Sequence, residues 1–356
     1  MATLIVFIGV LFGGSFLIYN IPSKSANKIM LIYACLILTL FCGLIDARSF
    51  GTDIMNYYNR ADMALGTSLK DFMGQGAFEA GYKVFTWVVV NTFHSAQAYL
   101  IIQALLVNAI VFVFIYKNSK NVFISLIVYV CLGAFGFYFT AFRQAIAMAI
   151  CLIAIMLIKN QHRILAIPVI LLASYFHQTA IVLLPIIFLR NIKVNLKNLI
   201  ISAILVIIIG LFFDEILQLA NSEFDMNYGT VESSNEISAL GGIINIIINT
   251  ICFIFIYFLQ KNNSIQLLNN RKEYRNFYIY LGIVTLVLYS MRFYVLAMER
   301  VAFYLLPIFT VLYAEVFNEK IMTKNLQLFQ IGFVLISIAL FIWRFYPIAV
   351  GYKMVL

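Results

Sequence analysis

Apolar segments long enough to cross a bilayer recur along the whole of this chain. Its 356 residues are 63% hydrophobic and 11% charged, which leaves too few polar side chains to coat a soluble protein. A hydrocarbon core about 30 Å thick needs about 20 apolar helical residues, and it excludes backbone with unpaired polar groups. The sequence therefore predicts an all-α, polytopic membrane protein with about ten full transmembrane helices. These segments lie near residues 4–19, 29–45, 98–116, 122–139, 145–158, 199–213, 243–259, 277–297, 301–316 and 329–345.

Most of the 24 Lys and Arg residues fall in alternate connections between these segments, which the positive-inside rule places in the cytoplasm. The net charge of +9 therefore reflects topology, and a nucleic-acid partner is not expected. Two polar connections, 46–83 and 214–241, are then outer loops too short to fold alone, so residues 1–356 form one transmembrane domain. The cytoplasmic clusters are Lys24/Lys28, Lys117/Lys120, Lys159/Arg163, Arg190/Lys193/Lys197, Lys261/Arg271/Lys272/Arg275 and Lys320/Lys324.

Two further apolar segments do not fit this alternation as simple crossings. Residues 84–93 begin and end outside, and residues 164–189 begin and end inside with His177 at their centre. Pro168 and Pro185 flank His177, so the second segment is predicted to be a broken or re-entrant hairpin that holds His177 at membrane depth. A single kinked span is the alternative.

Arg143 and His177 interrupt long apolar runs, and ionisable residues in such runs are functional-site candidates by default. Arg292, Glu299 and Arg300 are spaced to share a helix face near the same outer level. With Arg48, these arginines can hold phosphate oxygens through two-pronged guanidinium contacts. The alternative for each arginine is a helix-end anchor whose charge reaches the interface.

The first outer loop combines acids, basic residues, asparagines and paired tyrosines within the fifteen residues 46–60. Carboxylates such as Asp53 suit sugar hydroxyls, and the ring of Tyr57 suits the apolar face of a sugar. Glu79 and Tyr82 follow just before the chain returns to the membrane. A solvated loop can also have this composition.

Cysteine and histidine usage predicts neither a metal site nor a cofactor. The five cysteines lie in apolar segments without ligand spacing, and no histidine has a second ligand three or four residues away. No phosphate-cradling glycine loop or nucleophile elbow is present in the sequence.

Several motifs give the chain a resemblance to a known family. They are Arg48-x4-Asp53-x3-Tyr57-Tyr58, Glu79-x-Gly-Tyr82, Phe142-Arg-Gln-x-Ile-Ala-x-Ala149, Ala173-x3-His177-Gln-Thr-Ala180, the stretch from Arg300 to Pro307, and Arg344-x-Tyr-Pro347. With these motifs the chain resembles the EpsG family of Wzy-type polysaccharide polymerases over nearly its whole length. The 214–241 loop has no matching pattern.

The resemblance implies a GT-C-like, metal-independent glycosyltransferase of the bacterial cytoplasmic membrane with its active site facing outward. It would join oligosaccharide repeat units carried on undecaprenyl pyrophosphate, as O-antigen, capsule or exopolysaccharide, with a chain-length regulator as a candidate partner. Arg143, Arg292, Arg300 and Arg48 would bind pyrophosphate, and Gln144, Tyr57 and Tyr82 would position sugars. His177, Asp53 and Glu79 compete for the general base.

Two other classes of protein stay open on the sequence alone. A flippase or transporter of lipid-linked sugar would also carry outer arginines and a broken helix, although it would be expected to show internal symmetry. A membrane O-antigen ligase or acyltransferase is the second alternative. A cytoplasmic His177 would favour the acyltransferase.

Overall fold

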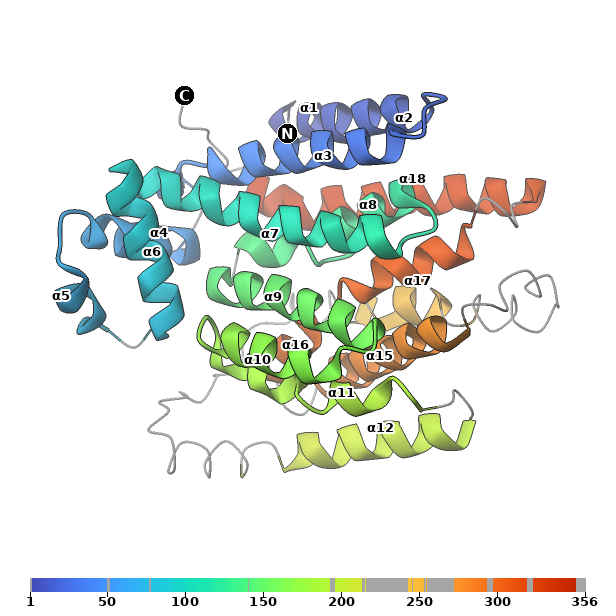
Figure 1. Cartoon of the computed structure of the whole chain (residues 1–356). Coiled ribbons are helices and arrows are strands. Elements are labelled where there is room, and N and C mark those ends of the chain that lie inside the picture. Colours follow the sequence, from blue (N-terminus) through green and yellow to red (C-terminus); the bar gives the residue numbers. More distant parts are fainter. Residues whose placement is uncertain are drawn as a thin grey trace.

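A computed structural model of the chain consists of helices and their connections (Figure 1). No β-strand occurs in the ranges described here, and the predicted all-α class is confirmed over them. Those ranges are residues 2–49, 52–76, 78–139, 141–192, 196–212, 215, 243–244, 246–252, 254, 272–292, 297–318 and 323–349.

Four described helices are long and apolar enough to cross a membrane. They are α3 (Ala26–Gly43), α7 (Ala96–Asn118), α9 (Phe142–Lys159) and α18 (Lys324–Ala349). The remaining helices have shorter apolar stretches, such as Asn276–Met291 within α15, so the predicted count of about ten full spans stays a prediction. They include α1 (Ala2–Ile8), η1 (Gly9–Gly13), α2 (Gly14–Tyr19), α8 (Val122–Cys131), α12 (Leu196–Leu211), α15 (Lys272–Met291) and α17 (Ile308–Val316).

The long helices pack side by side in the order α3, α7, α9 (Figure 1). Gly43 at the end of α3 allows close approach to α7, because a Cβ there would lie 2.7 Å from the Cα of Ile101. Gln97 donates hydrogen bonds to the carbonyls of Gly43 and Ile45, which joins the end of α3 to the start of α7. Buried Gln103 donates to the carbonyl of Phe142 at the start of α9. Helices α7 and α9 therefore run in the same direction, and α3 runs against them.

Lys28, Lys117, Lys159 and Arg190, which the sequence places in the cytoplasm, lie at one end of this bundle, which we call the lysine end. Lys28 and Tyr116 line one groove there, and the Nζ of Lys159 donates to the side-chain oxygen of Asn118. Tyr278, near the start of α15, donates to the same oxygen at 2.8 Å. The opposite end, where α7 and α9 begin, is called the site end.

Residues 163–190 leave the lysine end and return to it. Helix α10 (Arg163–Ser174) packs along α9, the chain reverses at His177, and η4 (Gln178–Leu183) and α11 (Ile186–Leu189) lead back. The Nε of Arg190 then donates to the carbonyl of Lys159 at 3.0 Å, so both ends of the segment meet the same end of α9. The predicted broken hairpin with His177 at its turn is confirmed, and its depth in a membrane stays a prediction.

Two predicted spans are interrupted, so those predictions were wrong in extent. Helix α8 ends at Cys131, because Gly133 adopts a φ of 110° that a helix cannot contain, and a short 3-10 turn η3 (Gly136–Phe139) follows. The predicted span 301–316 is divided into α16 (Ala297–Phe303) and α17. The break precedes Pro307, which disfavours helix at the residue before it.

The first outer loop is largely helical, which the sequence did not predict. It contains η2 (Ala47–Ser49), α4 (Thr52–Ala64) and α5 (Leu69–Met73), and it leads into α6 (Ala80–Phe93). These elements lie together at the site end (Figure 1). Apart from Glu215, the second outer loop, 214–241, lies outside the residues described.

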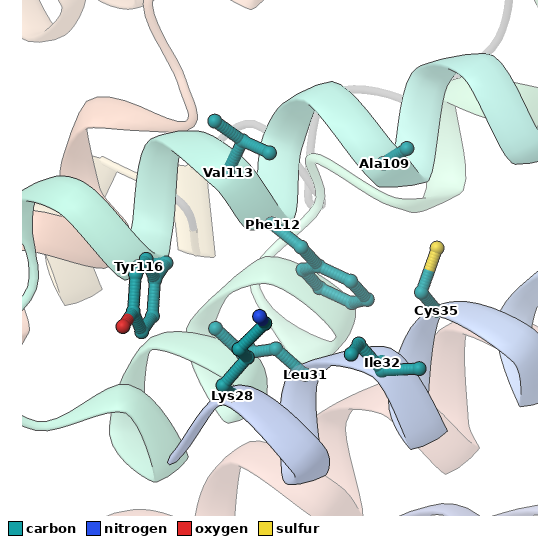
Figure 2. Close-up of a pocket in the computed structure, with 8 residues that line it drawn as sticks. All are labelled: Lys28, Leu31, Ile32, Cys35, Ala109, Phe112, Val113 and Tyr116. Carbon is teal, nitrogen blue, oxygen red and sulfur yellow. The ribbon is translucent and has the colours of Figure 1, made fainter. Parts of the chain in front are cut away.

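A groove of about 240 Å³ lies between α3 and α7 at the lysine end. Figure 2 shows Lys28 and Tyr116 near one end of it and Cys35 and Ala109 near the other. Its lining is apolar apart from these groups and includes neither a carboxylate nor a histidine. The groove therefore lacks the acid and base groups that a glycosyl-transfer site needs.

Candidate active site

Glu79 is the centre of a charged cluster at the site end. One carboxylate oxygen pairs with the Nη1 of Arg143, and the other lies 3.1 Å from the Nδ1 of His177. The second oxygen also accepts a hydrogen bond from the backbone N–H of Gln178 at 3.3 Å. The residues come from the N-terminus of α6, the first turn of α9 and the turn of the broken hairpin. The carboxylate is only 9% exposed, so it is a largely enclosed ionic group.

A backbone contact places Glu79 beside His177. The N–H of Gly81, in the first turn of α6, donates to the carbonyl of Tyr175 at the end of α10, at 2.9 Å. A Cβ at position 81 would lie 2.8 Å from that carbonyl oxygen, closer than side chains pack. Glycine is therefore required for this approach of α6 to α10. The Glu79-x-Gly-Tyr82 motif thus combines the carboxylate with the residue that positions it.

The electrostatics of the cluster keep Glu79 ionised. Burial raises the pKa of this carboxyl, but the hydrogen bond from His177 and the positive charge of Arg143 act in the opposite direction. Together they outweigh burial and hold the pKa of Glu79 below its ordinary value. An ionised carboxylate can only accept hydrogen bonds, so the Nδ1 of His177 carries the hydrogen in this contact. The Nε2 of a neutral His177 is then left with its lone pair.

Aromatic rings form one wall of the cluster. Tyr57 of α4 stacks on Phe142 with ring centres 4.8 Å apart, and it also lies against Phe78 at 5.9 Å. The guanidinium carbon of Arg143 lies 4.3 Å from the ring centre of Phe78. This cation–π contact fixes the guanidinium beside Glu79. Tyr82 contacts the ring of Tyr57 edge-on, with ring centres 5.9 Å apart.

Two predicted sugar-binding residues are buried rather than open to a ligand. Tyr82 is fully buried and accepts a hydrogen bond from the hydroxyl of Tyr99 at 2.8 Å. Gln144 is 2% exposed and donates to the backbone carbonyl of Arg300. Their positions favour supporting the site over direct contact with a sugar. Tyr57, by contrast, is only half-buried.

A second ion pair lies beside the first cluster. Arg292, at the end of α15, donates to a carboxylate oxygen of Glu299 at 2.6 Å. Helix α16, which carries Glu299, is joined to the hairpin because the hydroxyls of Thr179 and Tyr304 lie 2.9 Å apart. The Gln144–Arg300 hydrogen bond joins α16 to α9 as well. Helix α16 therefore links the two ion pairs through the hairpin and α9.

The remaining predicted residues lie at the surface. Asp53 is exposed in the first turn of α4, Arg48 is exposed in η2, and the side chain of Arg300 is exposed on α16. No contact described here joins Asp53 or Arg48 to Glu79. The structure thus brings together Glu79, Arg143, His177 and Tyr57 and leaves Asp53 and Arg48 at the periphery.

Sequence reasoning missed Arg60, Phe78 and Lys83. The guanidinium carbon of Arg60 lies 4.7 Å from the ring centre of Phe78, on which Arg143 also rests. Asp53, Tyr57 and Arg60 are spaced four and three residues apart, which places them on one face of a helix. That spacing would have identified Arg60 if the outer loop had been predicted to be helical.

Within the ranges given above, no group of three or more His, Cys, Asp or Glu side chains is arranged to hold a metal ion. The five cysteines are free and buried.

Comparison with known proteins identifies one family. The EpsG family model matches residues 28–355, nearly the whole chain and all the residues of both ion pairs. No curated protein and no solved structure matches the chain. Because the match extends over far more than half of the sequence, the chain belongs to the EpsG family.

Proposed function

We propose that this protein is a polysaccharide polymerase that joins lipid-linked oligosaccharide repeat units by glycosyl transfer. Membership of the EpsG family supports a polymerase of this type in a membrane. The observation that carries the proposal is the placement of Glu79 between Arg143 and His177. This arrangement combines a carboxylate-oriented imidazole with a guanidinium group, which suits a reaction that removes a proton and releases pyrophosphate.

The arrangement of charges supports chemistry at the outer face of the cytoplasmic membrane. The cluster occupies the site end, whereas Lys28, Lys159 and Arg190 lie at the lysine end. The positive-inside rule assigns the lysine end to the cytoplasm. The cluster then faces outward, where undecaprenyl-pyrophosphate-linked repeat units would reach it.

In the proposed step, a hydroxyl oxygen of the acceptor repeat unit attacks the anomeric carbon of the donor chain. The bond from that carbon to the pyrophosphate oxygen breaks, and undecaprenyl pyrophosphate leaves with the electron pair. The hydroxyl proton passes to the Nε2 of His177. Glu79 orients the imidazole through Nδ1 and stabilises the imidazolium that forms, as carboxylates do in catalytic triads. The transition state resembles an oxocarbenium ion.

In this proposal, arginine side chains bind the pyrophosphate leaving group. Arg143 would bind pyrophosphate oxygens and offset the charge that develops there, together with exposed Arg300 and Arg48 and with Arg292, which is buried in its pair with Glu299. Tyr57 would stack on a sugar ring, and Gln144 and Tyr82 would support the site from within the core. Asp53 is the reserve candidate for the base or for contact with the acceptor, because it is exposed on the helix that carries Tyr57.

Purified protein and synthetic lipid-linked repeat units test the function directly. Wild-type protein should extend the units into longer chains, and extension should persist in excess EDTA because arginines replace a metal ion. His177→Ala should reduce extension by at least about 100-fold, as expected for the loss of a general base. Lys70→Ala, an exposed change in the same outer loop, is the matched control.

Two results would contradict the proposal. If folded wild-type protein did not extend the repeat units, the proposed polymerase activity would be contradicted. Full-length glycan on lipid carrier in a deletion strain would do the same in cells, where a single repeat unit is expected. Loss of extension in EDTA that Mg²⁺ restores would contradict metal independence alone.

A further inference from the structure

Two guanidinium groups rest on the ring of Phe78, and a carboxylate, that of Glu79, pairs with one of them, Arg143. The guanidinium groups of Arg60 and Arg143 both rest on the Phe78 ring, at 4.7 and 4.3 Å from its centre. They can be no further apart than the sum of these distances, which is short enough for one pyrophosphate group to contact both. Lys83 is buried, and it donates to the carbonyl of Gly76, the residue whose Cα the Arg60 guanidinium approaches.

Lys83 fixes the loop that carries this cluster. Its Nζ donates to the carbonyls of Met73 at 2.9 Å and Gly76 at 2.8 Å. Burial lowers the pKa of this lysine, and the charge of Arg60 lowers it further, whereas Glu79 opposes both effects. Gly76 connects the two cations, because its carbonyl accepts from Lys83 and its Cα lies against the Arg60 guanidinium. Lys83 is therefore a positioning residue whose charge adds to the site.

Gly76 sets the position of the Arg60 side chain. It has a φ of 63°, which favours glycine, and a Cβ there would lie 2.0 Å from the Nη2 of Arg60. The guanidinium thus occupies space that only glycine leaves open. This fit holds a long, half-buried side chain against Phe78.

The charges of the cluster do not balance. The ion pairs among the described residues are Arg143–Glu79, His177–Glu79 and Arg292–Glu299, and Arg60 takes part in none of them. Asp53, two turns away on the same helix, is exposed. Glu79 is already paired with Arg143 and His177. The positive charges of Arg60 and Lys83 are therefore in excess over the negative charge of this partly enclosed cluster. Such a site attracts a polyanion strongly.

We propose that Arg60, Arg143 and Lys83 form a polyanion site on Phe78 that binds the pyrophosphate of the lipid-linked substrate, with Arg60 making the main direct contact. The assignment of pyrophosphate rests on the proposed function, whereas the excess of positive charge does not. Phe78 directly precedes Glu79 in the chain, and Glu79 contacts His177. A pyrophosphate bound on Phe78 would therefore bring the attached anomeric carbon close to His177. Arg143 contacts both groups, which joins the leaving-group site to the acid–base pair.

The experiment measures binding of inorganic pyrophosphate and of undecaprenyl pyrophosphate to the purified full-length protein in nanodiscs. Arg60→Ala should weaken both by at least about tenfold, the loss expected for a charge-assisted hydrogen bond. Arg60→Lys should recover part of the affinity, because it keeps the charge without the guanidinium fork. Lys70→Ala makes the same charge change on an exposed residue of the same loop and should alter binding by less than about twofold.

Gly76→Ala provides a second variant that retains every charge. The added methyl group displaces the Arg60 guanidinium, so binding should weaken although the composition of the cluster is unchanged. Elution as a single species and a wild-type melting temperature identify the variants that remain folded.

Binding by Arg60→Ala equal to that of wild type would overturn the inference, as would absence of pyrophosphate binding by wild-type protein. An equal loss in Arg60→Ala and Lys70→Ala would also overturn it, because it indicates non-specific attraction. A different outcome separates the two proposals. If wild-type protein bound pyrophosphate through Arg60 but did not extend repeat units, the proposed function would be contradicted and the polyanion site would still be supported.

Discussion

The carboxylate of Glu79 and the Nδ1 of His177 lie 3.1 Å apart, although 98 positions separate them in the chain. The contact depends on two structural features that meet at the site end: the N-terminus of α6 and the reversal of the broken hairpin. Because Glu79 stays ionised, it fixes which nitrogen of His177 carries a proton. This geometry supports the proposal that His177 is the general base and that Glu79 orients its imidazole ring.

The lowered pKa of Glu79 predicts a pH-dependent stability. A carboxyl whose pKa is lower in the folded protein stabilises the fold above its unfolded pKa, and this stabilisation is lost as pH falls through the folded value. The melting temperature of wild-type protein should therefore exceed that of Glu79→Gln most clearly above about pH 5. The difference should shrink below about pH 4. Melting curves in detergent across this range measure the difference. A difference that stays constant with pH would show that the charge of Glu79 does not contribute to stability.

Gly81 provides a test of how the pair is positioned. Gly81→Ala should force α6 away from Tyr175, since the new Cβ meets backbone rather than a movable side chain. We expect destabilisation of about 1–3 kcal/mol, and extension activity should fall further than stability alone explains. Gly74→Ala is the control, because its Cβ would lie 3.5 Å from the nearest described atom, in ordinary contact. Equal activity of the two variants would show that the Gly81 contact does not set the site geometry.

Much of this fold was accessible from sequence because lipid restricts the backbone to few solutions. The all-α class, the separation of the lysine end from Arg143, and the hairpin around His177 all follow from apolar length, charge parity and proline. Interruptions at Gly133 and before Pro307 were missed. An apolar run alone does not record a φ of 110° or the local effect of a proline.

The site was predicted in part for a different reason. Arg143 and His177 were identifiable because ionisable residues stand out in apolar sequence, and Glu79 was identifiable from its motif with Gly81 and Tyr82. Their mutual pairing depends on tertiary contacts such as that of Gly81 with Tyr175. Arg60 and Lys83 were missed because charged residues in a polar loop carry no such contrast. The contact of Arg60 with Phe78 and the burial of Lys83 arise only once α4 and α6 pack together.

Arg143→Lys tests whether geometry matters beyond charge. The lysine keeps a cation near Glu79, but it loses the planar fork and the stacking on Phe78. Loss of one charge-assisted hydrogen bond corresponds to a decrease in activity of roughly 10- to 100-fold. Chain extension by membranes containing equal amounts of each protein measures this. If Arg143→Lys extended chains as fast as wild-type protein, Arg143 would be only a helix-end anchor.

The last prediction concerns orientation, on which the outer-face chemistry depends. Met63 is 54% exposed on α4 at the site end, and Lys117 is exposed near the end of α7 at the lysine end. In a background without the five native cysteines, Met63→Cys should react with a membrane-impermeant thiol reagent in intact cells. Lys117→Cys should react only after the membrane is opened, because the positive-inside rule places it in the cytoplasm. The reverse pattern of labelling would place Glu79, Arg143 and His177 at the cytoplasmic face, where an acyl donor rather than a lipid-linked glycan would be the expected substrate.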